Sequence, residues 1–295
     1  MNDVLIARGN AKLHILNCRL VRLLMDSADS LHLAKISKNY FLKRSIMALL
    51  PGFKTTESYK IRAYDVDNQK RATVPALMKC MHEAAMTNAI HLNLSVWDLE
   101  PHGISWVLMR KKLTIHRLPI LGEQIHVQTY PAGFEKFFTY RDYIVRDDQG
   151  VLIAQASTTW LLMDTKTRKM ARIPDFILSL EMPDPTTCLP RLSIKIRKFG
   201  ATHLQQSFRV GWYDLDFNMH LNNLYYLQWI LETLPDTILQ NRQLKDINIL
   251  YKLECKWKEE VVAETEKISD SFFRHRLIRQ SDKKEVVLAE TNWGA

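Results

Sequence analysis

Apolar and polar positions follow two different periods along this chain of 295 residues. Residues 59–64 alternate with period two, which predicts a strand. Residues 74–92 lack glycine and carry apolar side chains at helical spacing, which predicts a long helix with a wide buried face. Period two then returns in four stretches that predict strands, at residues 106–116, 124–130, 137–147 and 151–164.

This order of elements occurs twice in the sequence. Tyr64-Asp65-Val66-Asp67 is matched 149 positions later by Tyr213-Asp214-Leu215-Asp216, and Glu83 is matched at the same offset by Glu232. We interpret this as an internal duplication of one unit, made of a strand, a long helix and an antiparallel meander. A sheet wrapped around an apolar helix buries both, so the predicted fold class is α+β.

The duplication predicts the domain boundaries. The first copy covers residues 58–180 and the second covers residues 201–295. Residues 181–200 contain three prolines and are predicted to be the linker between the copies. Residues 1–46 have no counterpart in the repeat, and we treat them as a separate N-terminal extension.

Three polar residues near the start of the second copy are candidates for chemistry. Asp216, Asn218 and His220 have the spacing i, i+2, i+4, which on an extended segment points all three side chains to one face. The following Asn222 and Asn223 are good helix N-caps, so an apolar helix is predicted to start there. A helix N-terminus offers backbone N–H groups to a developing negative charge, which suits acyl transfer or hydrolysis.

The first copy does not repeat this set of residues. It retains Asp67 but has Gln69 in place of Asn218 and Arg71 in place of His220. The polar triad is therefore confined to the second copy.

The motif and several other segments resemble the acyl-[acyl carrier protein] thioesterases. The resemblance covers residue 58 to the C-terminus and rests on these segments: Asp214-Leu215-Asp216-x-Asn218-x-His220-x-Asn222-Asn223, Tyr226, Trp229-Ile230-Leu231-Glu232, Tyr251-Lys252-Leu253-Glu254-Cys255, Ile61-Arg62-Ala63-Tyr64, Trp106-Val107 and Thr167-Arg168-Lys169-Met170-Ala171-Arg172-Ile173-Pro174. After Cys255 the residues 256–259 depart from the Gly-Arg-Asp of the plant branch, so the chain looks more like a bacterial branch.

The resemblance implies a tandem, or double, hotdog fold, in which each half is an antiparallel sheet around one long helix. It implies that the first half binds the acyl chain along the helix at residues 74–92 and that the second half is catalytic. The implied reaction is hydrolysis of the thioester of acyl-[acyl carrier protein] in fatty acid biosynthesis, without metal or cofactor. The implied partner is acyl carrier protein with its acyl-phosphopantetheine, and a homodimer is left open.

Asp216, Asn218, His220, Glu254 and Cys255 are the candidate catalytic residues. Glu254 and Cys255 are adjacent on a predicted strand, so their side chains should point to opposite faces. We favour Glu254 as general base or water-positioning residue over Cys255 as nucleophile, because cysteine is commonly a buried core residue.

The charge and cysteine content narrow the class of protein further. The net charge of +9 suits an acidic partner, and no nucleic-acid-binding motif occurs. Basic residues of the first half are candidates for carrier contact: Arg141, Arg146, Lys166, Arg168, Lys169 and Arg172. The four cysteines are widely spaced, as expected for free thiols, and no stretch approaches the ~20 apolar residues of a membrane span.

Residues 1–46 carry eight basic and three acidic residues. They could be a start-site artefact with Met47 as the true start, a surface helix, or an organelle transit segment. We predict a cytoplasmic protein, with a plastid as the alternative if the segment is a transit peptide.

Two other functions compete with this reading. An acyl-CoA thioesterase on the same fold differs only in the carrier, and the positive charge favours the protein carrier. A non-catalytic hotdog protein that binds acyl chains is disfavoured by the complete polar set. Acyl chain length is not predicted.

Overall fold

The computed structural model describes residues 53–180, 182–191 and 195–294. The chain divides into residues 1–46 and 47–295, and the predictions for residues 1–46 lie outside the described residues.

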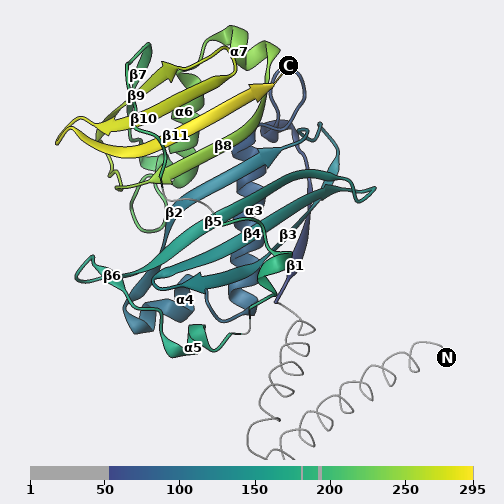
Figure 1. Ribbon diagram of the computed structural model, residues 1–295, viewed down its shortest axis with the longest axis vertical. Coiled ribbons are helices and arrows are strands. Elements are labelled where there is room, and N and C mark those ends of the chain that lie inside the picture. The colour runs from purple at the N-terminus through teal and green to yellow at the C-terminus, as the bar shows by residue number, and fades with distance from the viewer. Residues whose placement is uncertain (1–52, 181, 192–194, 295) are drawn as a thin grey trace, which may run out of the picture. The chain divides into compact units, whose positions relative to one another are not determined.

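The described strands form a single antiparallel sheet of eleven strands with the order β1-β3-β4-β5-β2-β8-β11-β10-β9-β7, and β6 pairs with β5 (Figure 1). The strands are β1 (Thr55–Lys60), β2 (Ile104–Ile115), β3 (Gln124–Glu135), β4 (Phe138–Asp147), β5 (Leu152–Asp164), β6 (Met170–Ala171), β7 (Leu204–Arg209), β8 (Gln243–Tyr251), β9 (Glu260–Lys267), β10 (Phe272–Arg279) and β11 (Lys284–Gly294).

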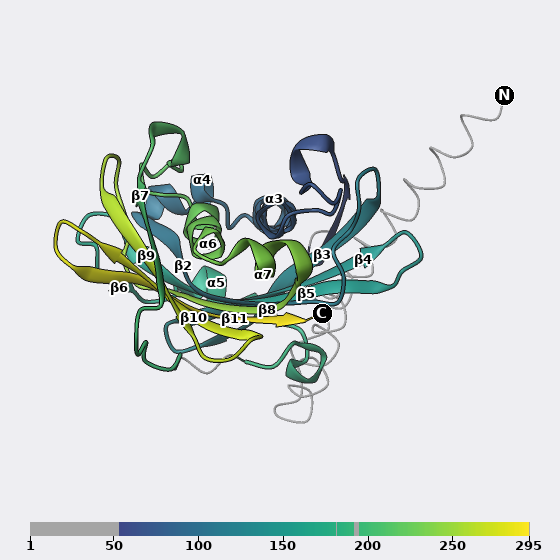
Figure 2. The same ribbon diagram turned by 90° about the horizontal axis from the view of Figure 1, so that it is seen from above.

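Two helices lie side by side on the concave face of the curved sheet, as Figure 2 shows. They are α3 (Val74–His91) and α6 (Asn223–Glu232). The shorter elements are α4 (Val96–Leu99), α5 (Asp175–Leu178), α7 (Asp236–Asn241) and the 3₁₀ turns η1 (Ala63–Asp65), η2 (Glu100–His102), η3 (Pro185–Thr187) and η4 (Trp212–Asp214).

The strand order is symmetric about the β2–β8 pair, so the internal repeat is visible in the topology. On either side of this seam the elements follow as strand, helix and meander, with β1 to β5 matched by β7 to β11. The two halves share one continuous sheet because β2 and β8 pair antiparallel over residues 110–114 and 246–250. The predicted α+β class and the tandem arrangement of two helix-wrapping sheets are confirmed.

Both long helices start at a side-chain cap, and the cap of α6 is the predicted Asn222. The Thr73 side chain accepts from the Ala76 N–H at the start of α3, and Asn222 accepts from the Leu224 N–H at the start of α6. Helix α3 buries Leu77, Met78 and other apolar residues against the sheet of the first half. The helix predicted at residues 74–92 is thus confirmed.

Some predicted boundaries were wrong. Strand β1 ends at Lys60, and a 3₁₀ turn begins at Ala63, so only the first part of the predicted strand at residues 59–64 is extended. Among the described residues of the predicted linker, η3 is the one regular element.

Candidate active site

The stretch Asp216–His220 is a tight turn, not the extended segment that its spacing suggested. The Asp216 backbone N–H donates to the His220 carbonyl, and Met219 adopts a positive φ of 61°. The Asp216 Oδ1 accepts from the backbone N–H groups of Asn218 at 2.8 Å and His220 at 3.1 Å. The Asp216 carboxylate therefore holds the turn that carries the other two side chains.

The first half contains the same turn with different chemistry. Asp67 Oδ1 accepts from the backbone N–H groups of Gln69 and Arg71, both at 2.9 Å, and Lys70 has a φ of 61°. The Arg71 guanidinium folds back onto Asp67 Oδ2, 3.0 Å from Nη2. The turn is therefore a feature of both copies, and in the first copy an ion pair takes the place of the imidazole.

His220 and Glu254 meet at the mouth of a cavity. His220 Nε2 lies 3.3 Å from Glu254 Oε2, and the His220 side chain is 16% exposed. The same Glu254 oxygen forms an ion pair with Arg168. Arg168 belongs to the first half, where it lies in the turn between β5 and β6. A carboxylate, an imidazole and a guanidinium from both halves thus form one cluster.

Backbone contacts fix the segment that carries Glu254. Arg279 Nη1 donates to the Glu254 carbonyl at 2.6 Å, and the Leu221 N–H donates to the Cys255 carbonyl at 2.8 Å. The matching bond in the first half joins the Ala72 N–H to the Pro119 carbonyl. By this correspondence, Leu118 of the first copy occupies the position equivalent to Glu254. The first copy therefore has neither the carboxylate nor the imidazole of the pair.

Cys255 points away from this cluster into the core of the second half. It is fully buried, and its N–H donates to the Tyr226 hydroxyl at 2.8 Å. Burial raises the pKa of the Cys255 thiol to about 11, which disfavours the reactive thiolate. Glu254 lines the cavity, so the two side chains point in different directions. The predicted strand is wrong at these positions, because β8 ends at Tyr251 and residues 252–255 are irregular.

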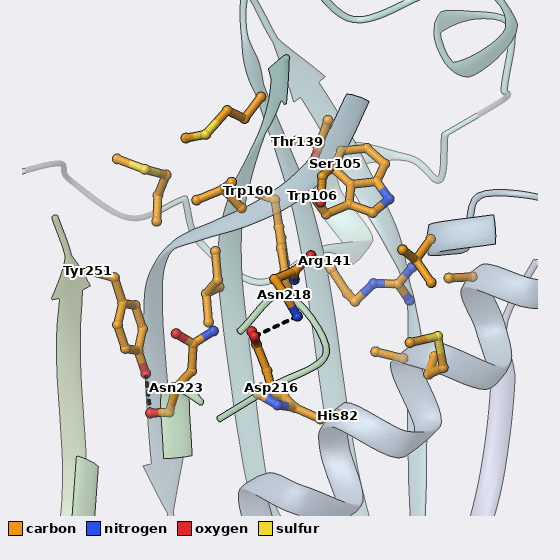
Figure 3. A pocket seen from close by; sticks show the side chains of 18 of the residues that line it. His82, Ser105, Trp106, Thr139, Arg141, Trp160, Asp216, Asn218, Asn223 and Tyr251 are labelled. Atoms are coloured by element: carbon orange, nitrogen blue, oxygen red, sulfur yellow. Dashed lines mark hydrogen bonds between the residues drawn. The ribbon is translucent and has the colours of Figure 1, made fainter. Parts of the chain in front are cut away.

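The cavity has a volume of about 810 Å³ and extends from the second-half turn along α3 (Figure 3). Asp216, Asn218, His220 and Glu254 line one part of it. Its apolar lining comes mainly from the first half and includes Ala85, Met86, Ala89, Leu94, Trp106, Leu108 and Trp160. On α3, Met78 and Met81 are core residues, whereas Met86 lines the cavity.

Two of the cations predicted to contact the carrier have partners at the site. Arg141 lines the cavity, where its Nη1 donates to Asn88 Oδ1 at 2.6 Å, and Arg168 is paired with Glu254. Lys166, Lys169 and Arg172 are exposed, as carrier contact requires. His82 also lines the cavity with Lys111 behind it, and neither residue was predicted from the sequence.

Within residues 53–180, 182–191 and 195–294, no three His, Cys, Asp or Glu side chains are arranged as metal ligands. None of the helices in this part of the chain has the length and apolar character needed to cross a membrane.

The fold and the site define a tandem hotdog protein with one carboxylate–imidazole site at the mouth of a largely apolar cavity. The family model for the acyl-ACP thioesterase N-terminal domain matches residues 52–180, and the model for the C-terminal domain matches residues 199–295. The chain therefore belongs to the acyl-ACP thioesterase family.

Similar proteins come from plants and bacteria. A palmitoyl-acyl carrier protein thioesterase of Cuphea hookeriana is 28% identical over 80% of this chain and 61% of its own length. The chain spans about three fifths of the length of the plant relatives that it matches first. An acyl-ACP thioesterase from Bacteroides thetaiotaomicron matches with a TM-score of 0.73 and 21% identity, over 82% of this chain and 98% of that chain.

A plant structure is as similar as the bacterial one. The 12:0-ACP thioesterase from Umbellularia californica has a TM-score of 0.73 and 24% identity, over 83% of this chain and 98% of that chain. These likenesses confirm the fold, and assignment to a bacterial-type branch stays a prediction.

Proposed function

We propose that the protein hydrolyses the thioester of acyl-[acyl carrier protein] and releases a free fatty acid. The observation that supports this most directly is the His220–Glu254 pair at the mouth of an apolar cavity in a chain of this family. Plant relatives are named acyl-[acyl-carrier-protein] hydrolases. The first half supplies most of the cavity wall for the acyl chain, and the second half supplies the reacting groups.

Glu254 is the proposed general base. Oε2 faces His220 and Arg168, and among the described residues no hydrogen bond to Oε1 is found, so that oxygen is available to a water molecule. The water oxygen attacks the thioester carbonyl carbon while Glu254 takes the proton. The C–S bond then breaks, and the thiolate of the carrier receives that proton.

Asn218 and His220 are the proposed polar contacts to the substrate and water. Both line the cavity, and the turn held by Asp216 fixes their backbone. The Asn218 amide can donate to the developing oxyanion, and His220 can orient the water beside Glu254. In this proposal Asp216 is a positioning residue and Cys255 is dispensable.

A comparison of variants at adjacent positions tests the assignment. Glu254→Gln is expected to lower kcat by roughly 10²-fold or more, the usual scale for loss of an acid–base group. His220→Ala should act similarly, and Cys255→Ser should stay within a few fold of wild type. If Cys255→Ser is the more damaging and an acyl group can be trapped on Cys255, the general-base proposal is wrong.

The carrier is part of the same proposal. Comparison of kcat/KM for one acyl chain on acyl carrier protein, on CoA and on pantetheine measures the preference directly. A clear preference for the CoA thioester would assign the protein as an acyl-CoA thioesterase. Binding of acyl chains without hydrolysis of any thioester would make it a non-catalytic binding protein.

We place the protein in the cytoplasm, with a plastid as the alternative. The plant relatives are named chloroplastic, and residues 1–46 are basic. A fluorescent fusion of the full chain, compared with a fusion that starts at Met47, tests this in plant cells. Accumulation of only the longer fusion in plastids would establish residues 1–46 as a transit segment.

A further inference from the structure

Two cationic side chains of the first half, one in the cavity wall and one behind it, have no carboxylate partner among the described residues. Arg141 on β4, Thr158 on β5 and Lys111 on β2 are direct cross-strand partners in one row. Partners in such a row point to the same face of a sheet, and strands are about 4.8 Å apart. Arg141 and Lys111 therefore both face α3, two strands apart.

Neither cation is neutralised by a carboxylate. Lys111 is fully buried, and among the described residues no carboxylate lies within 4.0 Å of either group. Arg141 Nη1 donates to the neutral oxygens of Asn88 and Thr129. Burial of cations without a counter-charge is costly, so a protein that keeps two of them usually has a use for them.

His82 connects the buried lysine to the cavity. Lys111 Nζ lies 2.9 Å from His82 Nε2, and His82 projects from α3 into the cavity lining. Burial and, to a smaller extent, Lys111 lower the pKa of His82 well below its ordinary value, so the ring is neutral at pH 7. When Nε2 accepts from the Lys111 ammonium, the ring proton must be on Nδ1, and His82 becomes a hydrogen-bond donor.

Tyr143 adds a third donor to the same wall. It lines the cavity, and the Lys111 Nζ lies 5.5 Å from its ring centroid. Burial raises the pKa of Tyr143 to about 12, so its hydroxyl stays protonated. Figure 3 shows Arg141 and His82 entering the cavity from the sheet and from α3 respectively.

We propose that His82, Arg141 and Tyr143, with Lys111 behind His82, bind an oxygen-bearing group on the acyl chain itself. The substrate class is an acyl thioester whose chain carries a hydrogen-bond acceptor, either a carboxylate or a hydroxyl, beyond the thioester. Among the described residues the buried Tyr143 hydroxyl has no hydrogen-bond partner, and a purely hydrocarbon chain would leave it so, which is the more costly arrangement. This proposal rests on the proposed thioester hydrolysis and specifies its substrate.

Three thioesters on the same carrier test the proposal: octanoyl, 3-hydroxyoctanoyl and suberyl, which ends in a carboxylate. We expect at least one oxygen-bearing chain to exceed octanoyl by about tenfold or more in kcat/KM, mainly through a lower KM. The two oxygen-bearing substrates distinguish a carboxylate from a hydroxyl as the bound group. Equal or better hydrolysis of the octanoyl thioester by wild-type protein would refute the subsite and leave the proposed function intact, whereas no hydrolysis of any thioester would refute the proposed function.

Variants locate the subsite. Lys111→Met and His82→Leu should reduce the ratio of oxygen-bearing to octanoyl kcat/KM by about tenfold, with the loss in KM rather than kcat. Lys112→Met is the matched control, because Lys112 is the exposed neighbour on the same strand, and it should leave the ratio unchanged. An unchanged ratio in folded Lys111→Met and His82→Leu would remove these residues from the subsite.

A binding measurement covers the case in which these variants do not fold. Suberate or 3-hydroxyoctanoate should raise the Tm of the wild-type protein more than octanoate does at the same concentration. An equal or larger rise with octanoate would overturn the proposal.

Discussion

One buried side chain of the first half, Lys111, is expected to make the stability of the protein depend on pH. Burial lowers the pKa of Lys111 to about 7, whereas an unfolded lysine titrates near 10.5. Between these values the unfolded chain binds one more proton than the folded chain, so the contribution of Lys111 makes the protein more stable as pH rises. The cost of the buried ammonium is fully present below pH 7.

Lys111→Met should therefore be more stable than wild type at pH 6, with a difference that shrinks toward pH 9. The full span corresponds to roughly 5 kcal/mol, and a two-unit rise in pH should remove a substantial part of it. Chemical denaturation of both proteins at pH 6, 7.5 and 9 measures this, and Lys112→Met serves as the control. A difference that does not depend on pH would show that Lys111 stays protonated in the folded protein across this range, so that burial does not lower its pKa.

At the residue scale, alternation along strands was predictable and long-range pairing was not. Glu254 and Cys255 point in different directions, as expected from period two, although the segment that carries them is irregular rather than a strand. The same rule applied to the three consecutive cations at residues 110–112 would have placed at least one of them on the buried face, and the structure buries Arg110 and Lys111. By contrast, Arg168 meets Glu254 across 86 positions, and no local pattern specifies such a contact.

At the scale of elements, the turn before each helix is the feature on which the site depends. The spacing of Asp216, Asn218 and His220 fits both an extended segment and a turn closed by the aspartate, so the sequence did not decide between them. The turn requires a positive φ at Met219, a conformation that residues other than glycine adopt rarely. The helices were easier to predict because their apolar spacing and caps are local.

Substitutions at Asp216 distinguish a structural role, in which its side chain stabilises the turn, from a direct role in the reaction. Asp216→Asn keeps an oxygen that can accept from the two backbone N–H groups, so it should retain most of the activity and stability. Asp216→Ala loses both bonds, and we expect a cost of about 1–2 kcal/mol together with a marked fall in kcat. Denaturation curves and turnover of both variants check this, and a large loss of kcat in a stable Asp216→Asn would instead make the carboxylate charge part of the chemistry.

At the scale of the whole molecule, the net charge of +9 predicts how the protein meets an acidic carrier. Electrostatic steering acts on the association rate and is screened by salt, with a Debye length of about 10 Å at 0.1 M. We expect kcat/KM for acyl carrier protein to fall as salt rises, while that for a pantetheine thioester barely changes.

Charge reversal at two exposed positions, Lys169→Glu with Arg172→Glu, should mimic high salt for the protein substrate alone. Arg168 is left unchanged, because its partner is Glu254 and its loss would alter the site itself. Equal salt dependence for both substrates would contradict steering by the carrier.

A chain that starts at Met47 should fold and hydrolyse substrate as the full chain does. The boundary between the two structural units falls at this residue, and the family match begins at residue 52. Thermal denaturation and kcat of the two proteins provide the comparison. Insoluble or inactive truncated protein would show that residues 1–46 contribute to the fold.

Both copies lie in one polypeptide and therefore come from one gene product, and the β2–β8 seam, with the bond from Arg110 Nε to Asn248 Oδ1 at 2.8 Å, joins them in one sheet. In an assembly of two identical chains, every mutation is inherited by both sites at once. Here each copy accumulates mutations independently, so Arg71 can stand where the other copy has His220 without cost to catalysis. Such a chain can adapt its substrate pocket and its reacting groups in separate mutational steps.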